Sequence, residues 1–86
     1  MIDKEFGVRR FVTEYSNETE ELLAEYELEA FELAAFQSKF GASNEDPMFD
    51  CYEIGQQHVA FLKQYLAMIP VWDFSRSSYY VEASAV

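Results

Sequence analysis

Basic residues are scarce in this chain: its 86 residues include six Lys and Arg against sixteen Asp and Glu, a formal net charge of −10. A duplex nucleic-acid binder needs Lys and Arg to neutralise phosphates, and anionic membrane surfaces attract clusters of the same residues. The charge balance therefore argues against nucleic acid and membrane as partners. Long apolar runs are also lacking, since none approaches the ~20 residues that span a bilayer. The first residues show no signal-peptide core, so we expect a cytoplasmic protein.

Reactive and metal-binding residue types are equally sparse. The single cysteine, Cys51, has no partner for an internal disulfide, and the single histidine, His58, has no second histidine for a zinc site. A Cys51–His58 pair would need electropositive surroundings, whereas Cys51 has acidic neighbours. We expect His58 to be a partly exposed helix residue. The acids within residues 44–53 could offer oxygens to calcium, but they lack the spacing of an EF-hand loop. The sequence thus predicts a non-enzyme with no cofactor and no metal.

The chain does contain enough apolar material for a core. Half of its residues are hydrophobic and 17% are aromatic, whereas a disordered chain would be poor in aromatic residues. Its length fits one domain, so residues 1–86 are predicted to fold as a single unit.

The N-terminal part predicts a β-hairpin. Residues 8–15 are rich in β-branched and aromatic side chains, residues 16–19 form a polar turn cluster, and residues 22–28 alternate with a period of two. A helix competes for residues 22–28, because Leu, Ala and Glu are good helix formers. We favour the hairpin, because the turn is well placed and the alternation is clean.

The register of this hairpin can be tested. If Tyr15 pairs with Glu20, Arg10 lies opposite Glu25, which is an attractive cross-strand pair. The same register would set other carboxylates opposite one another, at a cost of a fraction of a kcal/mol.

The remaining pattern alternates helices with short extended pieces. Another apolar residue follows Phe31 and Phe36 four positions later in each case, which predicts a helix. Gly41 suits the left-handed position after the end of this helix. Pro70 should stop the second helix. The predicted fold class is α+β, with a small antiparallel sheet, an N-terminal β-hairpin and two helices packed on one face. The expected segments are a helix over 29–40, a loop over 42–47, an extended piece over 48–54, a helix over 56–68 and a strand over 79–83.

Two adjacent tyrosines mark the last strand. On a strand, Tyr79 and Tyr80 point to opposite faces, so only one of them can be buried in a two-layer domain. The other is a candidate exposed aromatic residue of the kind that anchors interfaces.

The acidic residues are segregated. Residues 14–53 hold twelve carboxylates against one cation, Lys39, while the remainder of the chain is nearly neutral. This imbalance exceeds what solubility requires, and a field of this sign can steer a basic partner. The predicted partner-binding carboxylates are Glu14, Glu18, Glu20, Glu21, Glu25, Glu27, Asp46, Asp50 and Glu53.

Two stretches carry a family resemblance. Residues 46–54 read DPMFDCYEI and lead into a helix ending FLKQYL, and WDF then precedes SYYVE at residues 78–82. This pattern resembles small bacterial immunity proteins encoded beside polymorphic or contact-dependent growth-inhibition toxins. The resemblance implies a stoichiometric inhibitor (an antitoxin) of a cognate toxin domain, often a nuclease, and it supplies no binding residue.

The charge pattern and the resemblance therefore predict an immunity protein that binds a basic toxin domain through an acidic surface. The alternative is a non-catalytic adaptor or regulatory subunit that binds a basic host protein or homodimerises, which leaves a homo-oligomer open.

Overall fold

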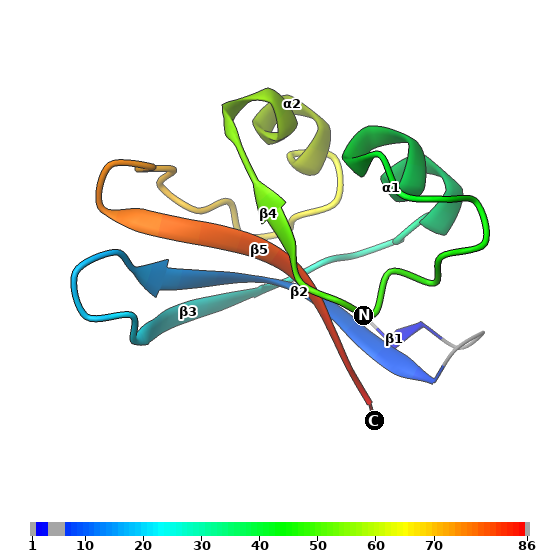
Figure 1. The fold of residues 1–86 in the computed structure, drawn as a ribbon, viewed down its shortest axis with the longest axis horizontal. Helices are drawn as coiled ribbons and strands as arrows, with labels where there is room; N and C mark the ends of the chain where they lie inside the picture. Colours follow the sequence, from blue (N-terminus) through cyan, green and yellow to red (C-terminus); the bar gives the residue numbers. More distant parts are fainter. Residues whose placement is uncertain (1, 4–6, 86) are drawn as a thin grey trace.

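The computed structural model describes residues 2–3 and 7–85 and confirms the α+β class. An antiparallel sheet forms one layer, and the two helices α1 and α2 lie over one of its faces (Figure 1). None of the helices in the described part of the chain has the length and apolar character needed to cross a bilayer. The elements in chain order are β1 (Ile2–Asp3), β2 (Val8–Ser16), β3 (Leu22–Glu27), α1 (Leu33–Phe40), β4 (Tyr52–Ile54), the 3-10 helix η1 (Gln56–His58), α2 (Val59–Leu62) and β5 (Ser77–Ala85).

Strands from opposite ends of the sequence form the centre of the sheet. β2 and β5 pair along their whole length, from Val8 opposite Ala85 to Ser16 opposite Ser77. β3 and the short β1 pair with the other edge of β2, and β4 pairs with the far edge of β5. The predicted edge strand in residues 48–54 is confirmed as β4, although only three of its residues are paired.

The predicted hairpin is confirmed, but its register differs from the expected one. Thr13 lies opposite Glu25, and the backbone carbonyl of Arg10 accepts a hydrogen bond from the amide of Leu28 at 3.2 Å. The cause is a longer turn: the Ser16 hydroxyl accepts hydrogen bonds from the amides of residues 18 and 19, and Glu20 adopts a left-handed backbone with φ 63°. A bulge at residues 14–15 adds a further shift.

The first helix starts later than predicted. The Glu29 amide donates to the Tyr65 carbonyl at 2.7 Å, and Ala30 has a left-handed φ of 53°, so the helix begins only at Leu33. The helix ends as expected, because Gly41 has φ 70° and its amide bonds to the Gln37 carbonyl.

The predicted helix over 56–68 was wrong in extent. Only η1 and the short α2 form there, because Leu66 pairs with Leu28 in an isolated β-bridge and draws the chain away from the helix axis. Leu62 and Leu66 are nevertheless buried, so the apolar periodicity identified the correct core side chains. This pairing with a residue distant in sequence, just after β3, outweighed the helical propensity of these residues.

The hydrophobic core lies between the sheet and the helices. Phe36 of α1 is fully buried, and its ring centroid lies 4.9 Å from those of both Phe61 and Tyr65. Val12 and Val81 lie opposite each other on β2 and β5 and close the core from the sheet side. Because strand side chains alternate, the neighbours of these valines point to the other face.

Candidate functional site

Polar and aromatic side chains from four strands lie together on the face of the sheet opposite α1 and α2. Residues directly opposite one another in an antiparallel pair share a face, so Thr13 lies with Tyr80 on β5 and with Glu25 on β3, and Tyr80 lies with Glu53 on β4. We call this surface the outer face. Its members on the four longer strands include Arg9, Phe11, Thr13, Tyr15, Glu25, Glu27, Glu53, Ser78, Tyr80 and Glu82.

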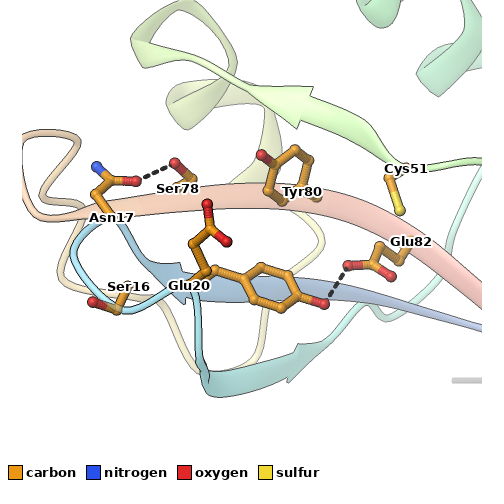
Figure 2. Close-up of a pocket in the computed structure, with 8 residues that line it drawn as sticks. Ser16, Asn17, Glu20, Cys51, Ser78, Tyr80 and Glu82 are labelled. Carbon is orange, nitrogen blue, oxygen red and sulfur yellow. Dashed lines mark hydrogen bonds between the residues drawn. The ribbon is translucent and has the colours of Figure 1, made fainter.

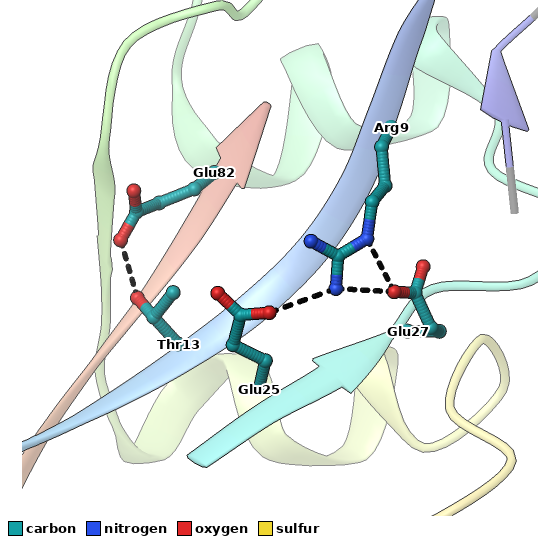
Figure 3. Close-up of polar contacts among 5 residues, drawn as sticks. All are labelled: Arg9, Thr13, Glu25, Glu27 and Glu82. Carbon is teal, nitrogen blue, oxygen red and sulfur yellow. Dashed lines mark hydrogen bonds and ion pairs between the residues drawn. The ribbon is translucent and has the colours of Figure 1, made fainter. Parts of the chain in front are cut away.

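An arginine holds two carboxylates at one end of the outer face. The Arg9 Nη2 lies 2.9 Å from the Glu25 Oε1, and Glu27 also accepts from the guanidinium, as Figure 3 shows. The Arg9 guanidinium carbon lies 4.1 Å from the Phe11 ring centroid. Partly exposed ion pairs of this kind contribute about 0–1 kcal/mol. Glu25 and Glu27, both predicted to bind a partner, are thus partly neutralised within the chain.

A pocket of about 370 Å³ occupies the other end of the outer face (Figure 2). The rings of Tyr15 and Tyr80 meet edge to face, with centroids 5.9 Å apart and an interplanar angle of 72°. Glu82 accepts hydrogen bonds from the hydroxyls of Thr13 and Tyr15, the latter at 3.4 Å. The described lining residues are Tyr15, Ser16, Asn17, Glu20, Cys51, Ser78, Tyr80 and Glu82.

The charged side chains among the described residues that line this pocket, Glu20 and Glu82, are both acidic. Burial raises the pKa of the Tyr15 phenol, and the charge of Glu82 raises it further. Burial also raises the pKa of the Cys51 thiol, with added contributions from Glu82 and Asp50. A reactive cysteine needs a lowered pKa, so Cys51 stays a thiol at neutral pH.

His58 is buried rather than partly exposed, which corrects the prediction. Its ring stacks on Phe40 of α1 with centroids 4.2 Å apart, and its Nδ1 accepts the Gly55 amide at 2.9 Å. Burial, followed by the charge of Lys39, lowers the pKa of His58. His58 packs against a helix, whereas Cys51 lines the pocket on the outer face. The two side chains therefore form no dyad.

Glu14, predicted to bind a partner, points toward the helix side of the sheet. It is half-buried and accepts hydrogen bonds from Tyr26 Oη at 2.9 Å, from Ser77 Oγ at 2.8 Å and from Tyr79 Oη at 3.4 Å. Glu14 thus links β3 to β5 across β2. Its position two residues after Val12 was the signal, because strand residues with this spacing share a face.

Asp46, also predicted to bind a partner, is used to shape its loop. One carboxylate oxygen accepts the Met48 amide at 2.8 Å and the other accepts the Tyr52 hydroxyl. The hydrogen bond from Tyr52, and then the one from Met48, lowers the pKa of Asp46. Within the described residues, no grouping of three or more His, Cys, Asp or Glu side chains could hold a metal ion.

The other predicted carboxylates are exposed in two groups. Glu18, Glu20 and Glu21 lie in the hairpin turn, and Asp50 and Glu53 flank Cys51 at the β4 edge. The turn group and the β4 group thus bracket the pocket, since Glu20 and Cys51 both line it.

Sequence reasoning found part of the pocket. Tyr79 is fully buried and Tyr80 lies on the outer face, as the alternation predicts. Tyr15 and Glu82 were not predicted as residues of this face. Because strand residues two positions apart share a face, pairing β2 with β5 would have placed them with Thr13 and Tyr80.

Two exposed apolar side chains lie at a second, largely polar cavity. Leu23 and Val71, which are 55% and 89% exposed, line a further cavity beside the hairpin turn together with Glu18. Met68 is 75% exposed in the same 66–71 segment. Exposed apolar side chains beside charged ones are common at protein interfaces.

These features define a small acidic α+β domain with an aromatic, carboxylate-lined outer face. The sequence matches a family described as a domain of unknown function, DUF7683, over residues 9–82. Because this match spans most of the chain, the protein belongs to that family. No curated protein and no solved structure matches it.

Proposed function

We propose that this protein is a cytoplasmic immunity protein that binds a basic toxin domain, of the nuclease kind, and neutralises it by occupying its surface. The observation that carries the proposal is the outer face, where exposed carboxylates of the hairpin turn and of the β4 edge lie on either side of an aromatic pocket. The resemblance in residues 46–54 and 78–82 supplies the biological role.

The charge arrangement supports binding to a basic partner. Glu18, Glu20 and Glu21 are exposed acids that form no ion pair among the described residues, unlike Glu25 and Glu27, which Arg9 holds. At physiological salt the Debye length is about 8 Å, so neighbouring carboxylates act together. Such a field raises association rates with a basic partner on the order of 10- to 1,000-fold.

Co-expression with the C-terminal domain of a neighbouring toxin gene tests the proposal. We expect growth to be restored when this protein is present, and a complex of the two chains to be recovered in equal amounts. Unrelieved toxicity together with no complex would refute the proposal.

A charge-matched pair of variants locates the surface. Glu18→Lys with Glu21→Lys should slow association at least about 10-fold, because the reversal lies in the hairpin turn. Glu29→Lys with Glu45→Lys changes net charge equally at exposed sites outside the turn and β4. Equal slowing by both pairs would show that total charge, rather than the turn, directs binding.

The exposed apolar side chains favour one alternative, a homodimeric adaptor. Leu23 and Val71 lie together at one cavity, and burial of such residues drives association. Equilibrium sedimentation distinguishes the two functions. A tight, salt-insensitive dimer that Leu23→Ser disrupts, with no basic partner bound, would favour the adaptor.

A further inference from the structure

The aromatic pocket on the outer face has the features of a cation receptor. Its volume of about 370 Å³ lies within the roughly 300–1,000 Å³ range of side-chain and small-ligand pockets. Two tyrosine rings line it, and aromatic rings attract cations within about 6 Å of their centroids.

Both charged groups among the described lining residues are carboxylates, Glu20 and Glu82. They approach from different elements: Glu20 from the hairpin turn and Glu82 from β5. Figure 2 shows the Glu20 side chain pointing toward β5, between Ser78 and Tyr80, with Glu82 beside Cys51 at the other end of the pocket. Burial is the main cause of the raised pKa values of Tyr15 and Cys51, and the charge of Glu82 raises both further.

The hydrogen bonds of Glu82 fix its position for a ligand. Thr13 and Tyr15 both donate to its Oε2, so the carboxylate is oriented before anything binds. Thr13 is itself buried, which holds its hydroxyl rigid. A positioned carboxylate beside an aromatic wall suits a planar guanidinium, which donates in a fork and stacks on rings, better than a compact ammonium.

We propose that this pocket receives an arginine side chain of the basic partner, with its guanidinium between the tyrosine rings and the carboxylates of Glu20 and Glu82. This inference rests on the proposed function for the source of the arginine. It adds a specific anchor to the broader acidic surface, since buried arginines paired in this way often dominate the energetics of an interface.

The direct test uses small probes and no partner. N-acetyl-arginine-N-methylamide should produce saturable amide shifts at Tyr15, Asn17, Ser78 and Tyr80 in a two-dimensional nitrogen–proton NMR titration. The neutral isostere N-acetyl-citrulline-N-methylamide should bind at least 10-fold more weakly, and so should N-acetyl-lysine-N-methylamide. Equal affinity for either analogue would overturn the assignment to arginine.

Two variants tie the binding to the pocket. Glu82→Gln should weaken the probe at least 5-fold. Glu20→Asn should also weaken it while keeping the fold, because asparagine accepts the left-handed backbone that Glu20 adopts at φ 63°. Glu45→Gln, at an exposed loop site outside the lining, removes the same charge and should leave affinity unchanged. If all three variants weaken the probe equally, the attraction is a general charge effect and the pocket assignment fails.

The two proposals fail separately. Loss of probe binding with toxin protection intact would refute the arginine pocket and leave the immunity role standing. Specific probe binding without any protection would refute the immunity role and leave the pocket standing.

Discussion

The adjacent residues Arg9 and Arg10 permit a sharp test of how burial changes the contribution of a charged side chain to the free energy of unfolding. They lie on opposite faces of β2. Arg10 is fully buried, and its Nη1 donates to the Met48 carbonyl at 2.7 Å, which ties the segment between α1 and β4 to the sheet. Its guanidinium carbon lies 4.5 Å from the Phe31 ring centroid. Arg9 keeps 32% of its side chain exposed.

The contacts give the magnitude. A hydrogen bond from a charged donor contributes about 1.5–3 kcal/mol, and a desolvated cation–π contact adds about 2 kcal/mol. The cost of burying the guanidinium offsets part of this sum. We therefore expect Arg10→Met to lower the free energy of unfolding by about 3 kcal/mol, a large part of the ~4–13 kcal/mol expected for a domain of this size.

Arg9→Met is the matched control. Its ion pairs with Glu25 and Glu27 are partly exposed, so the loss should be no more than about 1 kcal/mol. Urea denaturation followed by Trp72 fluorescence measures both variants, and the melting temperature of Arg10→Met should fall by about 12–24 °C. Equal losses in the two variants would refute the reasoning, because burial would then not distinguish the two arginines.

Two further predictions follow from the pKa shifts. Alkylation of Cys51 by iodoacetamide should have a pH midpoint above that of an ordinary thiol, and Glu82→Gln should lower this midpoint more than Asp50→Asn; the reverse order would contradict the proximity of Glu82. Burial, followed by the hydrogen bond to Glu14, raises the pKa of Tyr26 to about 12, above its ordinary value of 10.0. The stabilisation that the protonated Tyr26 phenol contributes is therefore complete below pH 10 and is lost as the pH rises toward about 12. The free energy of unfolding should fall over that window less steeply in Tyr26→Phe than in the unmodified protein.

The fold class could be predicted because the hydrophobic periodicities were clear. The alternation in residues 22–28 correctly favoured a strand over a helix, and Gly41 correctly marked the end of α1. The length of the second helix could not be predicted, because the bridge between Leu28 and Leu66 is a contact distant in sequence. The hairpin register failed for a local reason, the Ser16 hydroxyl bonds that lengthen the turn.

The candidate site was predictable only as a composition. The number of carboxylates could not distinguish Glu14, which accepts hydrogen bonds from three hydroxyl groups of the chain, from Glu18, which is exposed in the turn. Pairing β2 with β5 is what brings Tyr15, Tyr80 and Glu82 together, and residues so far apart in sequence give no local signal of proximity.

The pairing of β2 with β5 also has a consequence for folding. β2 can pair with β3 early, because the two strands are joined by a short turn. The other edge of β2 pairs with residues 77–85, so the central ladder forms only after a long loop closes. Topologies dominated by such distant pairing fold slowly and leave strand edges exposed meanwhile. Charged side chains on an unpaired edge oppose pairing between chains. We therefore expect the glutamates of the hairpin to oppose pairing between chains while the sheet is incomplete, whatever they bind afterwards.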